Sequence, residues 1–298
     1  MFIDIHTHAY RITPPLGCKF CTAEQLIEVM DAHKIDMAAV LPIVNAEIYF
    51  PQANEDILEM CDNHPDRLIP YCNIDPRCLT NSPVAQLDKA LQYYKDKGCK
   101  GCGEVMPNMQ LIDPMVQNLF HCCEKVGLPI VYDGSAQLTG DFGLYDEAGL
   151  PQLECTLLTY PDLLIFGHGP VFWNEIARLD TVGSRAVFFT AIGKQRGILP
   201  TGPVDEEGAV PKLLRKYKNL MGDLADGTAY NAIARDPSYG PRFLSEFEDK
   251  LFFGTDIVSP TMPFELDTLL ISWREQGKIS ETTFRKIAYE NAEKLYGL

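Results

Sequence analysis

The sequence predicts an α/β fold, a (β/α)8 TIM barrel that forms a single domain over residues 1–298. The first observation is that eight short apolar segments alternate with segments of helical pattern, which is typical of parallel strands covered by helices. The second is that eight such units in about 300 residues match the size of this barrel, with no linker dividing the chain. The third is that no glycine-rich dinucleotide motif follows any strand, which disfavours a doubly wound open sheet.

The strands are expected where β-branched, aromatic and aliphatic residues form short runs. The first run begins the chain, and the last, Leu251–Asp256, precedes the two final helices. The eight expected strands are residues 1–8, 36–42, 67–74, 99–105, 128–133, 163–168, 220–225 and 251–256.

The helices are expected between the strands, and several have a recognisable start signal. Thr22 opens a capping pattern that Gln25 completes three residues later. The prolines of Ser82-Pro83 and Asp113-Pro114 are typical of a first helical turn. The expected helices are residues 22–33, 51–63, 82–97, 113–126, 151–160, 170–179, 211–217, 227–235, 264–276 and 280–296. Residues 9–21 are expected to be a loop, and residues 180–208, rich in glycine and proline, to be irregular.

The net charge and the hydropathy of the chain limit the classes of partner that it is expected to bind. The formal net charge of −15 argues against nucleic acid and anionic membrane surfaces, which attract basic patches. No apolar run approaches the roughly 20 residues of a membrane span. The first residues show no secretory signal, so a cytoplasmic location is expected. The expected partner is a small-molecule substrate, and a homodimer is one of the oligomeric states left open.

The cysteines are expected to be reduced thiols. The chain has 10 cysteines and no visible signal, and two pairs have CxxC spacing, Cys18/Cys21 and Cys99/Cys102. A structural zinc site is the alternative interpretation. Cys99 and Cys102, however, lie in an expected strand, where positions three apart face opposite ways. We therefore predict buried thiols that do not bind zinc.

The first eight residues are the most informative stretch. Positions two apart on a strand share a face, so Asp4, His6 and His8 are expected to project to the same side. Two imidazoles placed in this way can chelate one metal, and Asp4 is spaced to hold one of them. The alternative interpretation is a polar strand terminus with two solvated histidines.

More polar residues stand at the ends of other expected strands. In a (β/α)8 barrel the carboxyl ends of the strands form the active site, so these side chains are expected to converge. Each alone could be a loop cap or a core polar group. The residues are Glu104, Asp133, His168, Asp223 and Asp256. The remaining histidines, His33, His64 and His121, are expected on the surface or in packing contacts.

Together these motifs resemble the amidohydrolase superfamily, in its amidohydrolase-related branch. The segments that carry the resemblance are Asp4-Ile-His-Thr-His8, Gly103-Glu104, Phe166-Gly-His-Gly-Pro170, Phe253-Gly-Thr-Asp256 and the ending Glu290–Tyr296. The resemblance implies one divalent metal, usually zinc, held by His6, His8 and Asp256, with Glu104 as a shared ligand. It implies that His168 is either a ligand of a second metal or a catalytic acid/base.

The chain departs from the family at the end of the fifth strand. The family usually has a histidine there, whereas this chain has Tyr132-Asp133-Gly134. An aspartate can bind zinc, or it can hold a neighbouring residue. We predict one Zn²⁺ bound by His6, His8, Glu104 and Asp256. A second metal bound by His168 and Asp133 is the alternative.

The resemblance implies an enzyme with one of two reactions. In hydrolases of the branch, Asp256 would take the proton of a metal-activated water that attacks an ester, lactone or amide, and His168 would stabilise the oxyanion. Decarboxylases of the branch use the same residues to orient a carboxylated substrate. They usually keep the fifth-strand histidine, so Asp133 favours hydrolysis. A metal-binding barrel without catalysis is the third hypothesis.

The sequence gives less information about the substrate-binding residues than about the metal site. A small, carboxylated substrate is expected, and Arg235, Lys194 and Arg196 are candidates to bind its carboxylate. Asp223 is a further candidate for substrate binding. Trp173 could line the pocket or anchor its helix.

Overall fold

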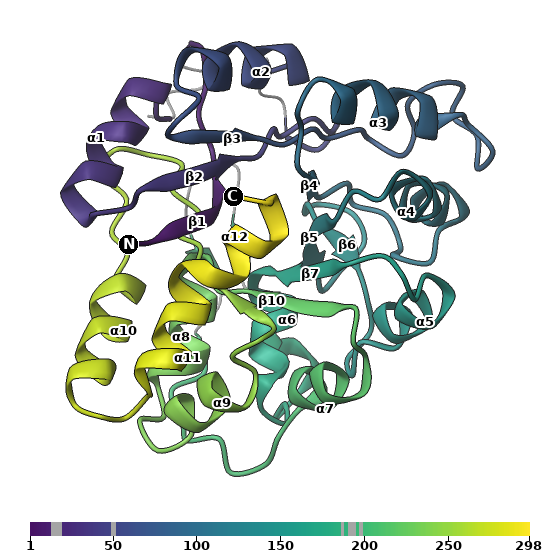
Figure 1. The fold of residues 1–298 in the computed structure, drawn as a ribbon. Helices are drawn as coiled ribbons and strands as arrows, with labels where there is room; N and C mark the ends of the chain where they lie inside the picture. The colour runs from purple at the N-terminus through teal and green to yellow at the C-terminus, as the bar shows by residue number, and fades with distance from the viewer. Residues whose placement is uncertain (13–19, 49–51, 186–187, 190–194, 197–198) are drawn as a thin grey trace.

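Eight parallel strands form a closed barrel at the centre of the computed structural model (Figure 1). The structure describes residues 1–12, 20–48, 52–185, 188–189, 195–196 and 199–298. The barrel strands, in chain order, are β1 (Ile3–Thr7), β2 (Met37–Val40), β3 (Leu68–Pro70), β4 (Cys102–Val105), β5 (Ile130–Ser135), β7 (Ile165–His168), β10 (Leu220–Asp223) and β11 (Leu251–Phe252).

Contacts on two sides close the barrel between the ladders β1-β2-β3 and β4-β5-β7-β10-β11. On one side Cys72 bridges to Cys102, which joins β3 to β4. On the other side Thr7 bridges to Ile257, and the amide of Ile5 donates to the carbonyl of Phe253, which joins β1 to β11. All strands run in one direction, so their carboxyl ends meet at one end of the barrel. The predicted (β/α)8 fold is confirmed.

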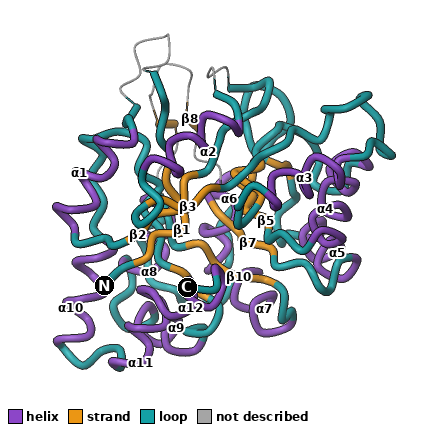
Figure 2. The backbone as a smooth tube through the Cα atoms, turned by 45° about the horizontal axis from the view of Figure 1, so that its top comes forward, coloured by secondary structure: helices purple, strands orange, loops and turns teal. Residues whose placement is uncertain are grey.

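Helices surround the barrel, as Figure 2 shows with helices in purple around the orange strands. They are α1 (Ala23–His33), α2 (Asn54–Asn63), α3 (Leu87–Asp96), α4 (Pro114–Val126), α5 (Pro151–Thr159), α6 (Gly169–Trp173), α7 (Ala209–Lys216), α8 (Asp226–Ala234), α9 (Gly240–Glu246), α10 (Leu266–Glu275), α11 (Glu281–Arg285) and α12 (Asn291–Tyr296). No helix in the described ranges is both long and apolar enough to span a bilayer.

Apolar side chains fill the barrel interior and leave only its carboxyl end for a site. Inward-facing residues of the strands, among them Ile5, Val131 and Phe166, form one buried cluster with Ala292 and Tyr296 of α12. The Tyr296 hydroxyl lies 3.1 Å from that of Tyr71. The C-terminal helix therefore closes the amino end of the barrel.

Several element boundaries were predicted wrongly. The helix expected from residue 82 begins at Leu87, because residues 82–85 form turns. The helix expected from residue 51 begins at Asn54. The helix expected at 280–296 is interrupted by a π-helical turn at Lys286–Glu290, where the carbonyl of Ile287 accepts the amide of Phe253.

A few elements were not predicted at all. They are α9, the short strand β6 (Leu144–Tyr145) beside β5, and an antiparallel pair within residues 180–208 made by β8 (Phe188–Phe189) and β9 (Gln195–Arg196).

Candidate metal centre

Two imidazoles from β1 and its carboxyl end present nitrogen atoms to one point. His8 Nδ1 lies 2.8 Å from the carbonyl of Leu41, and His6 Nδ1 lies 2.5 Å from Asp223 Oδ2. Both Nδ1 atoms face acceptors and therefore carry the proton, which leaves the Nε2 lone pairs free. The two Nε2 atoms are 3.2 Å apart. Two lone pairs this close repel each other unless a cation lies between them.

Glu104 and Asp256 complete a cage around that point. Glu104 Oε2 lies 3.5 Å from His6 Nε2 and 3.4 Å from His8 Nε2, and Asp256 Oδ1 lies 3.7 Å and 3.2 Å from the same two atoms. Four ligand atoms at zinc distances from a tetrahedral centre would be about 3.3–3.6 Å apart. The distances from the two imidazoles to each other and to the two carboxylates are close to that range, so the four residues are suited to bind one divalent metal.

The closure of the barrel positions Asp256. Its amide donates to the carbonyl of His6, and its φ of +58° turns the side chain over the two imidazoles. Asp4 does not hold an imidazole, so that expectation was wrong. The Asp4 carboxylate instead accepts the amide and hydroxyl of Thr255 at 3.1 and 2.6 Å, because the β1 register shifts between Asp4 and Thr7.

A second group of possible ligands lies beside the first. Glu104, Asp133 and His168 offer atoms that are all within 4.8 Å of one another, and Glu104 Oε1 lies 3.6 Å from His168 Nε2. Asp133 and His168 are direct neighbours in the ladder of β5 and β7. Asp133 Oδ1 is buried without a hydrogen-bond partner among the described residues. This group could hold a further cation, with Glu104 shared between the two positions.

Asp223 contacts the imidazoles of His6 and His168 on the side of their Nδ1 atoms. Its Oδ2 atom lies between His6 Nδ1 and His168 Nδ1, at 2.5 and 3.3 Å, although the second contact lacks hydrogen-bond geometry. Trp173 is fully buried and donates its indole N–H to the Asp223 carbonyl at 2.8 Å. Asp223 therefore orients imidazoles, a role that was not predicted from the sequence, and Trp173 anchors its helix behind the site.

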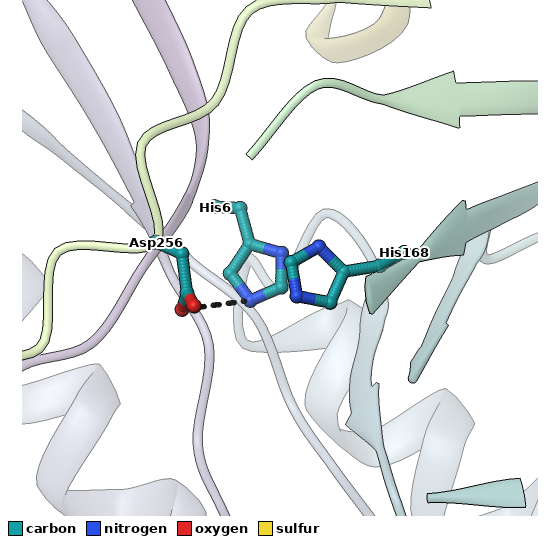
Figure 3. A group of neighbouring side chains, drawn as sticks. All are labelled: His6, His168 and Asp256. Atoms are coloured by element: carbon teal, nitrogen blue, oxygen red, sulfur yellow. Dashed lines mark ion pairs between the residues drawn. The ribbon is translucent and has the colours of Figure 1, made fainter. Parts of the chain in front are cut away.

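Figure 3 shows the rings of His6 and His168 side by side, with Asp256 on the far side of His6. The ring centroids of the two histidines are 4.3 Å apart. These three side chains converge from β1, β7 and the segment after β11, which are distant in sequence but adjacent at the carboxyl end of the barrel.

The electrostatic field at this point favours positive charge. Burial alone would lower the pKa of His6, but Asp223 and Glu104 outweigh burial and raise it. Burial and the charge of His6 oppose protonation of His168, yet Asp223 and Glu104 raise its pKa to about 9. Burial would raise the pKa values of Glu104 and Asp223, but the imidazoles hold both well below the usual range. A divalent metal would satisfy the same carboxylates.

A pocket of about 150 Å³ opens onto these residues, and its lining was only partly predicted. His8, Glu104, Asp133, His168 and Asp256 all line it. Two aspartates that were not predicted from the sequence, Asp141 and Asp226, line it as well. Asp226 begins α8 just after the segment 220–225 that was predicted as the seventh strand, a signal that could have identified it. Asp141 lies in a loop without any such signal.

Arg235 is the one predicted carboxylate-binding residue whose side chain is described, and it does not line this pocket. Arg235 follows α8 outside the lining, with Nε and Nη2 buried and without partners among the described residues. Lys194 lies outside the described residues, and only the backbone of Arg196, in β9, is described.

Among the described residues, no cysteine and none of His33, His64 and His121 lines the pocket or belongs to a group of possible ligands. Every cysteine in the described part of the chain is free, and Cys18 lies outside that part. His33 pairs with Asp267 at 3.0 Å, and His64 lies 3.9 Å from Glu24. The histidines that converge are therefore the three predicted to do so.

Comparisons with known proteins agree with this geometry. The profile of the family described as Amidohydrolase matches residues 3–298. No curated protein matches the chain.

Three solved structures illustrate the structural likeness. An uncharacterised TIM-barrel protein from Bordetella bronchiseptica has a TM-score of 0.66 at 16% identity, covering 99% of this chain and 98% of its own. A probable 2-pyrone-4,6-dicarboxylic acid hydrolase from Acinetobacter baumannii has a TM-score of 0.62 at 13% identity, covering 100% and 99%. A 5-carboxyvanillate decarboxylase from Novosphingobium aromaticivorans, with bound manganese, has a TM-score of 0.63 at 14% identity, covering 100% and 97%. At these identities the likeness shows the fold.

Proposed function

Because this chain belongs to the amidohydrolase family, whose members are metal-dependent enzymes, we propose that it hydrolyses an ester, lactone or amide of a small molecule. The observation that carries the proposal is the cage formed by His6, His8, Glu104 and Asp256. Its interatomic distances of 3.2–3.7 Å suit a divalent metal.

The donor set supports zinc as the metal. Two imidazole nitrogens and two carboxylate oxygens are common zinc ligands. The structurally similar decarboxylase binds manganese, so manganese is the alternative to be tested. One ion bound to these four residues is the proposed state, and a second ion at Glu104, Asp133 and His168 is the alternative.

In the proposed hydrolysis, each side chain of the site has a separate role. When bound, the metal supplies Lewis acidity, which lowers the pKa of water and polarises a carbonyl oxygen. The Asp256 side chain is 21% exposed, whereas that of Glu104 is 4% exposed, so Asp256 is better placed to accept a proton from water in the pocket. His168 also lines the pocket and can donate a proton to the substrate oxygen or the leaving group.

Decarboxylation is the second candidate reaction. The likeness to 5-carboxyvanillate decarboxylase supports it, and the site could orient a carboxylated ring. The aspartate at position 133 favours hydrolysis, because decarboxylases of this branch usually have a histidine at the end of the fifth strand.

A substrate screen with metal-loaded protein tests the reaction. Zinc- and manganese-loaded samples would be incubated with lactones, amides, esters and aromatic carboxylic acids. Proton release would report hydrolysis of esters and lactones, release of ammonia or an amine would report hydrolysis of amides, and release of carbon dioxide would report decarboxylation. We expect turnover of at least one carbonyl compound without carbon dioxide. Turnover restricted to carboxylic acids, with carbon dioxide as product, would contradict the proposal.

A further inference from the structure

The two adjoining hollows at the carboxyl end of the barrel are lined by acids. The pocket at the metal centre carries Glu104, Asp133, Asp141, Asp226 and Asp256. A neighbouring hollow has a volume of about 270 Å³. Asp226 lines this hollow as well, together with Glu265. Among the residues that the structure describes, no lysine or arginine lines either hollow.

The metal-centre pocket contains more carboxylates than metal binding requires. One divalent ion would neutralise two of the five carboxylates in the metal-centre pocket, and two ions would neutralise four. Asp141 and Asp226 belong to neither group of possible ligands. Asp141 and Asp226 therefore remain available to a substrate whichever metal count holds.

Asp226 is held in the wall between the two hollows. It has a φ of +73°, a left-handed conformation that few residues other than glycine adopt. The amide of Gly227 and the hydroxyl of Thr228 fix its carboxylate, the latter at 2.8 Å. An aspartate in the first turn of α8 also stabilises the helix dipole. That role does not require Asp226 to line the pocket together with Asp256 and His168, as it does here.

Asp133 and Asp141 extend the acidic wall on the other side. The hydroxyl of Ser135 donates to Asp141 at 2.8 Å. Asp133 is 4% exposed, lines the pocket, and has one carboxylate oxygen without a partner among the described residues. Asp133, Asp141 and Asp226 all line the same pocket. A cation in this part of the pocket would therefore meet several carboxylates at once.

The neighbouring hollow also suits a cation. Tyr230 and Phe264 line it together with Glu265. Aromatic faces attract ammonium groups, and they accommodate the methylene chain that carries such a group.

We propose that the substrate carries an ammonium group a few carbon atoms from its reacting carbonyl, and that Asp226 and Asp141 bind this group. The inference rests on the proposed function, because it places the carbonyl at the metal centre. It replaces the expectation of a carboxylated substrate, which depended on Arg235, Lys194 and Arg196.

Three hydroxamic acids with the same four-methylene spacer test the inference by binding alone. δ-Aminovalerohydroxamic acid ends in an ammonium, caprohydroxamic acid in a methyl, and adipic acid monohydroxamate in a carboxylate. Each can chelate the metal through its hydroxamate. Affinities for zinc-loaded protein would be measured by isothermal titration calorimetry, which requires no turnover. Asp226→Asn is the test variant, and Asp62→Asn, on the exposed surface of α2, is the control with the same change in charge.

We expect the ammonium compound to bind roughly tenfold or more tightly than the methyl compound, and the carboxylate compound more weakly than either. In Asp226→Asn the advantage of the ammonium should fall severalfold, while the affinity of the methyl compound stays the same. Asp62→Asn should retain the full advantage. Equal affinities, or a preference for the carboxylate compound, would overturn the inference and leave the metal centre intact. If none of the three compounds binds, the result contradicts both the proposed metal centre and this inference.

Discussion

Asp223 Oδ2 lies 2.5 Å from His6 Nδ1, although the two residues are 217 positions apart in the chain. The contact links β10 to β1 across the barrel, and both side chains are fully buried. It fixes the orientation and the tautomer of the imidazole, so that Nε2 points to the other possible ligands. The geometry of the metal centre therefore depends on a residue that binds no metal itself.

Replacing Asp223 should weaken metal binding. In Asp223→Ala, His6 loses the acceptor that holds its ring, and we expect zinc affinity to fall by about 10- to 100-fold. Competition with a chromogenic chelator would measure it. Asp267→Ala is the matched control, because it removes a buried partner of His33 outside the site. Unchanged zinc affinity in Asp223→Ala would show that the contact does not position His6.

Replacing His168 should separate catalysis from metal binding. If His168 is an acid/base group, His168→Asn should lower kcat by about 10²- to 10⁴-fold with metal content still near one ion per chain. Elemental analysis and steady-state kinetics on the same sample would measure both. A fall from two ions per chain to one would instead make His168 a ligand, with Asp133 and Glu104 as its partners. Unchanged kcat would support neither role.

Two features require glycine at position 169, its backbone conformation and the closeness of the Asp133 side chain. Gly169 has a φ of +80°, and a Cβ atom there would lie 1.9 Å from Asp133 Oδ1. Gly277 has a φ of +68°, and a Cβ atom there would have no neighbour within 4 Å. We expect Gly277→Ala to lose about 1 kcal/mol of unfolding free energy from backbone strain alone.

Gly169→Ala should lose more stability than Gly277→Ala, and it should also lower kcat because Asp133 must move. Urea denaturation and kinetics would measure the two effects. Equal stability losses with full activity would mean that the site tolerates displacement of Asp133.

The order of elements and the main residues of the candidate site could be predicted because they depend on local pattern. A strand-length apolar run followed by a polar residue marks a strand end, and parallel strands bring all such ends together. His6, His8, Glu104, His168 and Asp256 were identified in this way. The capping pattern at Thr22 likewise located α1 correctly.

The details that were missed depend on tertiary structure. Strict alternation placed Asp4 beside the imidazoles, but the register shift in β1 turns it toward Thr255. The role of Asp223 required knowledge of which strands face each other across the barrel. Asp141 lies in a loop whose course no periodic pattern specifies. Pro83 suggested a helix start, but the chain continues through turns until Leu87.

A buried ion pair should stabilise the segment after β7. Arg185 and Glu175 are both almost fully buried, with Nη1 and Oε1 3.5 Å apart. Arg185→Met would leave the buried Glu175 carboxylate without its charged partner and with the Gly149 amide as its remaining donor, and we expect a loss of about 3–5 kcal/mol in urea denaturation. Arg178→Met breaks an exposed pair with Glu206 and should cost less than about 1 kcal/mol. Similar losses in both variants would contradict this assignment.

The position of the metal tests the account most directly. Crystals of zinc-loaded protein would be measured on both sides of the zinc absorption edge, and an anomalous difference map would locate the ion. We predict one peak about 2.0–2.2 Å from Nε2 of His6, Nε2 of His8 and carboxylate oxygens of Glu104 and Asp256. No peak among these four residues, or a peak bound by cysteines instead, would contradict the account.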